Sequence, residues 1–205
     1  MNVAQTKQFP IPAEIGATFG GGFYAGALNL YGIPHALVVS PKAEGETEGA
    51  WNSKGARVVG AECFFDGAAN TPAMAEAGSE IAKWAQALQI GGFTDWHLPS
   101  RDELELLYRH LKPTAETNAC WVGDNPSSLP VGYAYRLEVP AQTAIDAFRG
   151  NGAEAFEDTW YWSSTQYAGD EGFAWHQDFG NGYQSRNDKS YAGRVRAVRL
   201  IQLTA

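Results

Sequence analysis

The side chains that could perform chemistry in this chain are two cysteines, four histidines and a group of acidic residues near the C-terminus. Cys63 and Cys120 lie in apolar surroundings, and no CxxC pair or Cys–His cluster accompanies them, so we expect no structural zinc site. The sequence leaves open whether they are buried free thiols or form one disulfide. The histidines show no ligand or nucleophile spacing; they are His35, His97, His110 and His176.

The acidic residues raise the question of a glycosidase, which needs two carboxylates facing each other across a cleft. The residues available for such a pair are Asp158, Asp170, Glu171, Asp178 and Asp188. None of them stands in a motif that would pair them or raise a pKa. We therefore interpret them as solvated loop carboxylates, and we expect a protein that is not an enzyme and that uses no metal and no other cofactor.

Two main helices are predicted to position these side chains. The first is expected over residues 72–90, because Thr71 can cap it and apolar residues follow at helical spacing. The second begins at Ser100, which forms the capping-box pattern S-x-x-E with Glu103. A short third helix is predicted over residues 140–148.

Strands account for most of the remaining pattern. From residue 159 the apolar period changes to two, as in a half-buried strand. The other predicted strands are residues 24–31, 36–39, 57–65 and 193–203. Together these elements predict an α+β fold with a small, twisted, mostly antiparallel sheet, two main helices and long ordered loops.

The overall charge and hydropathy exclude several classes of partner. The 205 residues carry a formal net charge of -8, which disfavours binding to nucleic acid. No apolar stretch approaches the roughly 20 residues of a membrane helix, so we expect no membrane insertion. The first residues lack the basic and apolar pattern of a secretory signal, which favours release by another route, such as cell lysis within a virus particle.

Three segments carry a family resemblance. They are residues 91–108 (GGFTDWHLPSRDELELLY), 159–167 (TWYWSSTQY) and 174–201 (AWHQDFGNGYQSRNDKSYAGRVRAVRLI). In this order they resemble the DUF1566 family, the C-terminal domain type of the Legionella collagen-like adhesin. The resemblance covers roughly residues 61–203. It implies a C-type-lectin-like fold of the formylglycine-generating-enzyme branch, with residues 1–60 as an N-terminal docking or oligomerisation segment and residues 61–205 as the ligand-binding domain.

Two activities known in that fold lack their residues here. The formylglycine-generating enzymes need paired cysteines late in the domain, and no cysteine lies between Trp121 and Ala205. Calcium-dependent sugar binding needs EPN-like or QPD-like and WND-like tripeptides, which supply oxygen ligands, and neither stands in the required place. The resemblance therefore implies binding without catalysis and without calcium.

A second resemblance concerns residues 174–199, which are similar to the variable region of diversity-generating retroelement proteins. In such systems copying errors at adenines can turn an Asn codon into codons for Tyr, Ser, Asp, His, Gly, Arg or Ala, but never for Trp, Gln, Lys, Glu or Met. This resemblance implies a fixed frame with variable residues between its members. The frame residues are Trp175, Gln177, Phe179, Gly182, Gln184, Lys189 and the RVRAVR tail at residues 194–199.

The residues between the frame positions are all reachable from an Asn codon, and we name them the candidate residues. They are His176, Asp178, Gly180, Asn181, Tyr183, Ser185, Arg186, Asn187, Asp188, Ser190, Tyr191, Ala192 and Gly193. Strand alternation predicts that the frame packs inward and that the candidate residues form one exposed ligand-binding surface. The alternative is a polar loop between two strands.

The function expected from these patterns is recognition of a cell-surface receptor, either a protein or a glycan. A bacteriophage tail-fibre or tail-tip protein of the virion, diversified by a retroelement, is the principal hypothesis. It would act as a homo-oligomer, with a trimer as the specific expectation. The alternatives are a bacterial surface or secreted adhesin of the same fold and a hydrolase of envelope glycans.

Overall fold

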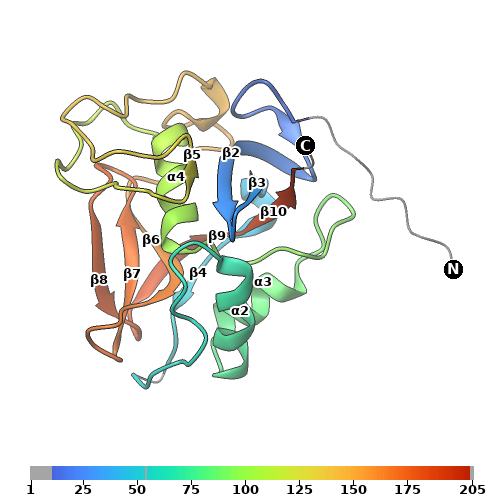
Figure 1. Cartoon of the computed structure of the whole chain (residues 1–205), viewed down its shortest axis with the longest axis vertical. Helices are drawn as coiled ribbons and strands as arrows, with labels where there is room; N and C mark the ends of the chain where they lie inside the picture. Colours follow the sequence, from blue (N-terminus) through green and yellow to red (C-terminus); the bar gives the residue numbers. More distant parts are fainter. Residues whose placement is uncertain (1–10, 54, 204–205) are drawn as a thin grey trace, which may run out of the picture.

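The computed structural model describes residues 11–53 and 55–203, which form two five-stranded sheets with helices around them (Figure 1). The first sheet contains β1 (Thr18–Phe19), β2 (Gly22–Leu30), β3 (Ile33–Val39), β5 (Ser128–Leu129) and β10 (Val198–Gln202). The second sheet has the order β4 (Glu46–Ala50), β9 (Ala192–Arg196), β6 (Trp160–Gln166), β7 (Phe173–Asp178) and β8 (Gln184–Asp188). Within the described residues, β6–β9 is the one parallel pair of strands.

The helices are α1 (Lys42–Gly45), α2 (Gly67–Glu76), α3 (Glu80–Ala87) and α4 (Arg101–Leu111), with a 3-10 turn at Asp146–Phe148. The predicted α+β class with mostly antiparallel pairing is confirmed. The prediction of a single sheet is wrong, because the strands divide into two. No helix in the described part of the chain is long and apolar enough to cross a bilayer.

Helix α4 lies at the centre of the molecule, and its start was correctly predicted. The Ser100 side chain accepts a hydrogen bond from the Glu103 backbone N–H, and the Glu103 carboxylate accepts one from the Ser100 N–H at 2.6 Å. Leu104, Leu107 and Tyr108 belong to one core with residues of β2, β3, β6 and β10. Both sheets are therefore packed against the same helix.

The helix predicted over residues 72–90 is two helices, so that prediction is wrong in its bounds. Helix α2 begins five residues earlier than expected, at Gly67, because Asp66 rather than Thr71 caps it. It ends before Gly78, whose φ of +98° suits a residue without a side chain. Ser79 then caps α3 by accepting a hydrogen bond from the Ala82 N–H.

Three other predicted elements also differ. Residues 57–65 form no strand, and only the 3-10 turn appears within the predicted helix 140–148. The C-terminal strand is divided at Ala197 into β9 and β10, which belong to different sheets. The buried guanidinium of Arg196 explains the break, because it donates to the Ser40 carbonyl and to Glu154 and so turns the chain from one sheet to the other. The strands predicted at 24–31 and 36–39 are confirmed as β2 and β3.

A chain of hydrogen bonds connects α4 to the hairpin of β7 and β8. The Tyr135 hydroxyl donates to the buried Glu105 carboxylate at 2.7 Å. The Gln177 side-chain amide donates to that hydroxyl and to the Gly182 carbonyl, each at 3.2 Å. The turn of the hairpin is thus fixed to the central helix through two side chains.

Replacing Tyr135 with Phe should lower the free energy of unfolding by about 1–3 kcal/mol, because a buried carboxylate and a buried amide each lose a partner. Urea unfolding measures this loss. The matched control is Tyr133→Phe, since Tyr133 is 53% exposed and no hydrogen bond of its hydroxyl is found in the described part of the chain. The control should change the stability by less than about 0.5 kcal/mol. Equal losses in both variants would contradict a role for this network.

Candidate functional site

A pocket of about 170 Å³ lies where β6, β7, β8 and β9 meet, and we name it the Trp160 pocket. Five candidate residues contribute to its wall together with five residues that were not predicted. The lining residues are Glu48, Thr159, Trp160, Trp162, His176, Asn187, Tyr191, Ala192, Gly193 and Arg194. The pocket therefore combines aromatic rings with amide, carboxylate and guanidinium groups.

Three stacked rings form the aromatic part of the pocket. His176 is the register partner of Trp162, which places both side chains on one face of the sheet. The His176 ring stacks on Trp160 with ring centroids 3.9 Å apart and on Trp162 with centroids 5.2 Å apart. Burial between these indoles lowers the pKa of His176 to about 4, because it disfavours the charged ring. At neutral pH the pocket therefore presents an uncharged imidazole.

The indole N–H of Trp162 is buried and has no hydrogen-bond partner among the residues that the structure describes. It lies over Gly193, where an added Cβ atom would approach the indole nitrogen to 2.7 Å. A side chain at position 193 therefore requires the Trp162 ring to shift. Gly193 is therefore a candidate residue that a larger residue could replace only if the Trp162 ring moved.

The turn between β7 and β8 is organised by its own polar side chains. The Asp178 carboxylate accepts a hydrogen bond from the Gly180 N–H at 2.8 Å, and the Asn181 side chain accepts one from the Tyr183 N–H. Gly182 has a φ of +78°, and a Cβ atom there would overlap Tyr108 and Tyr135. The assignment of Gly182 to the frame thus has a steric reason.

Burial and the nearby Asp158 raise the pKa of Asp178, burial being the larger cause. The Asp178 carboxylate nevertheless accepts a backbone hydrogen bond within the turn, as in a structural Asx motif. Within the described residues, no three His, Cys, Asp or Glu side chains gather as a metal site would require. Cys63 and Cys120 are both free thiols, which answers the question of a disulfide that the sequence left open.

The frame residues occupy interior positions, except Trp175 and Arg194. Lys189 is fully buried, and its ammonium lies 4.6 Å from the centroid of the Trp51 ring and donates to the Gln166 side chain. Phe179 is also fully buried, and Gln177 is nearly so. Trp175 is only partly buried, because it packs beside Phe64 and Tyr167 at the outer side of the sheet.

The candidate residues are mostly accessible, as expected for a surface. Apart from His176 and Gly180, none is buried. Tyr183 is 46% exposed and packs edge-on against Trp160, and Tyr191 is 61% exposed. Ser185, Asn187 and Ala192 are also accessible to solvent.

Two positional predictions are wrong. His176 is only 8% exposed, because the two indoles cover its ring on both sides. Arg186 does not share a face with Asn187, because successive strand residues point to opposite sides. Arg186 is the register partner of Trp175, and its guanidinium lies 5.2 Å from the centroid of the Tyr167 ring. The candidate residues thus occupy both faces of the hairpin.

Sequence reasoning missed part of the pocket. Trp160 could have been found from the period-two pattern, because it alternates with Tyr161 and so shares a strand face with Trp162. Glu48 and Arg194 carried no sequence signal, since only the pairing of β4 with β9 places them opposite each other. To predict that these two residues line the pocket, the order of the strands in the sheet would have to be known.

The comparisons with known proteins identify a family. A family model described as the Lcl C-terminal domain matches residues 44–199. The chain belongs to this family. No match was found among curated proteins. The Lcl C-terminal domain region begins before the predicted boundary at residue 61, and it includes β4 and every residue of the Trp160 pocket.

The low pKa of His176 predicts a pH dependence of stability. An unfolded chain binds a proton at this position below about pH 6.5, whereas the folded protein does so only below about pH 4. Between these values the unfolded state binds more protons, so the free energy of unfolding should fall as the pH falls from 6.5 to 4.

The variant His176→Gln should lack this part of the dependence. Urea unfolding of both proteins across the window measures the difference between their slopes. Parallel curves for the two proteins would contradict a neutral, buried His176.

Proposed function

We propose that this Lcl C-terminal domain protein is a non-enzymatic, adhesin-type binding protein that recognises a cell-surface receptor. The recognition surface surrounds the Trp160 pocket, and its accessible residues include Tyr183, Ser185, Asn187 and Tyr191. We propose further that the two sheets and α4 correspond to a C-type-lectin-like scaffold. Membership of a family named after an adhesin domain supports this function.

Residues 174–193 can be divided into two groups in two independent ways, and the two divisions agree. This agreement is the observation that carries the proposal. The first division concerns codons: Trp175, Gln177, Gln184 and Lys189 cannot arise from an Asn codon by changes at adenine, whereas all candidate residues can. The second division is burial: Gln177, Gln184 and Lys189 are buried and Trp175 is partly buried, while most candidate residues are accessible. A variable recognition surface requires that the positions open to diversification are also accessible to solvent.

The accessible residue types suit recognition. Tyr183 and Tyr191 supply rigid, amphipathic contact area with few rotatable bonds. Ser185 and Asn187 supply adaptable hydrogen bonding beside them. The uncharged His176 ring, stacked on Trp160, packs beneath these side chains.

The setting that we propose is the tail of a bacteriophage, with the protein as a homo-oligomer and a retroelement as the source of variation. A bacterial surface adhesin is the alternative, and it is favoured by the family name. The genomic surroundings distinguish the two. A reverse transcriptase gene and a near-copy of the coding segment for residues 162–199, next to tail genes, support the phage setting. Their absence contradicts diversification and leaves the adhesin.

Changing Tyr183 or Tyr191 to Ala should weaken adsorption to receptor-bearing cells by roughly 2 kcal/mol when the residue is central to the interface. Because both side chains are exposed, the melting temperature should change little. Flow cytometry of the labelled protein on bacterial cells and thermal unfolding measure the two effects together.

The matched control is Trp121→Ala, since Trp121 is an 88% exposed aromatic residue that does not line the pocket. It should adsorb like the unaltered protein. Arg186→Ala shows whether the interface extends to the opposite face of the hairpin. Normal adsorption of both tyrosine variants with intact folding places the binding site elsewhere and refutes the proposal.

A further inference from the structure

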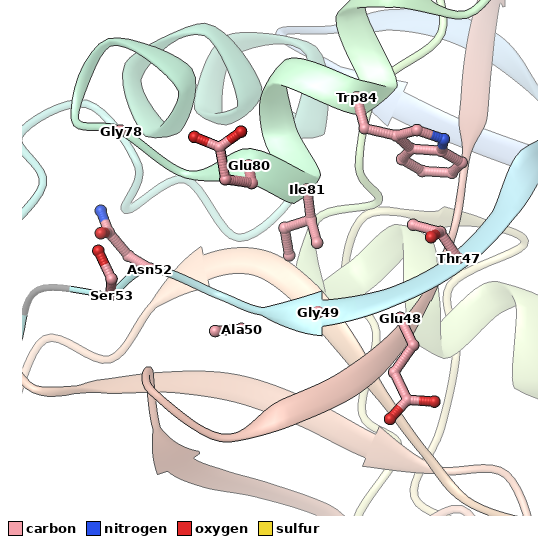
Figure 2. Close-up of a pocket in the computed structure, with 10 residues that line it drawn as sticks. All are labelled: Thr47, Glu48, Gly49, Ala50, Asn52, Ser53, Gly78, Glu80, Ile81 and Trp84. Atoms are coloured by element: carbon pink, nitrogen blue, oxygen red, sulfur yellow. The ribbon is translucent and has the colours of Figure 1, made fainter.

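A groove runs between strand β4 and helix α3, next to the Trp160 pocket, with which it shares the residue Glu48. It has a volume of about 340 Å³, and Figure 2 shows the side chains that line it. Strand β4 is the last strand of its sheet, because β9 pairs with one of its edges and no described strand pairs with the other. The groove therefore lies beside an unpaired strand edge.

The hydrogen-bond pattern shows which backbone groups face this edge. In an antiparallel ladder, hydrogen-bonded pairs of residues alternate with pairs that are not hydrogen-bonded. The Ala197 N–H donates to the Gly45 carbonyl, so Gly45 and Ala197 form a hydrogen-bonded pair. Because the two kinds of pair alternate along antiparallel strands, Thr47 and Gly49 bond to β9 in the same way. The N–H and C=O groups of Glu48 and Ala50 then point outward. Neither residue's backbone has another hydrogen-bond partner in the described part of the chain.

The helix side of the groove is apolar. In Figure 2 the side chains of Ile81 and Trp84 extend from α3 toward β4, next to Thr47. Gly49 brings the strand close to Ile81, since an added Cβ atom would lie 2.7 Å from that side chain. The Trp84 indole is only partly buried, and no hydrogen bond of its N–H is found among the described residues. A ligand with an apolar side chain would complete the packing of this ring.

The rim of the groove is acidic. Glu48 is exposed, and its side chain extends to the side of β4 away from α3 (Figure 2). On the α3 side, the side chain of Glu80 is 83% exposed and paired with Lys83 only through a surface ion pair. The whole chain carries a net charge of -8. Charge complementarity therefore favours a basic occupant.

We propose that the groove is a strand-addition site, in which an extended segment of another protein with alternating apolar and basic residues pairs with the outer edge of β4. Its backbone bonds to the outward groups of Glu48 and Ala50, as in other proteins that bind peptides at a sheet edge. Its apolar side chains pack on Ile81 and Trp84, and its basic side chains lie near the acidic rim. Unlike many exposed edges, β4 has no proline, lysine or bulge to prevent such pairing.

The test uses the full chain and a fluorescent octapeptide of alternating lysine and valine. Fluorescence polarisation should give saturable binding, and an octapeptide of alternating glutamate and valine should bind on the order of tenfold more weakly. With peptide bound, hydrogen exchange measured by NMR should slow on the order of tenfold at the amides of Glu48 and Ala50. The amides of Thr47 and Gly49, already paired with β9, should change little.

Two variants separate strand addition from general attraction. Ala50→Pro removes an outward N–H without breaking a bond to β9, and a proline is tolerated at such an edge position. It should weaken binding on the order of tenfold or more, whereas Ala50→Val, which keeps the N–H, should bind normally. If Ala50→Pro does not fold, Trp84→Ala replaces it, with Trp84→Phe expected to retain most of the binding.

Three results would overturn the proposal. They are no saturable binding of the basic peptide, binding that Ala50→Pro and Trp84→Ala leave unchanged, and exchange that slows equally at all four amides. Light scattering that shows self-association abolished by Ala50→Pro would also overturn it, because the occupant would then be a second copy of this chain. None of these outcomes depends on adsorption to receptor-bearing cells, which is the measurement that tests the surface around the Trp160 pocket.

Discussion

The structure depends on the burial of α4 on all sides, which forces the acidic residues of that helix to find partners inside the protein. Asp102, Glu103 and Glu105 are all buried. A buried carboxylate without partners is costly, so each one holds a different segment in place. Asp102 accepts from Ser127, and Glu103 accepts from Ser100 at the start of the helix.

Glu105 extends this constraint to the recognition surface. Burial raises the pKa of Glu105, as the larger influence, while Arg109 opposes the rise from 2.8 Å away. Tyr135 and Asn125 donate to the same carboxylate, so two points of the long connection between α4 and β6 are fixed by one side chain. Through Tyr135 and Gln177 the constraint reaches the turn of the β7–β8 hairpin. The position of the hairpin is thus set by side chains that lie behind its surface residues.

How much of this was predictable from the sequence differs between elements. The start of α4 was predictable, because a capping box is a local pattern that needs no tertiary information. The buried positions of Gln177 and Lys189 followed from the division between frame and candidate residues. The division of the last strand at Ala197 was not predictable, because it depends on the partners of Arg196 in two distant segments. The position of Arg186 was missed because neighbouring side chains of strand β8 point to opposite faces, so Arg186 and Asn187 do not share a surface.

The central claim is that residues 174–193 consist of a fixed interior and a replaceable surface. A saturation-mutagenesis library over this segment, sorted by resistance of the displayed protein to protease, measures tolerance at every position. The account predicts that Gln177, Gly182 and Lys189 tolerate few substitutions, whereas Tyr183 and Tyr191 tolerate nearly all. Equal tolerance at Lys189 and Tyr191 would contradict it, since the division between frame and surface would then have no physical basis.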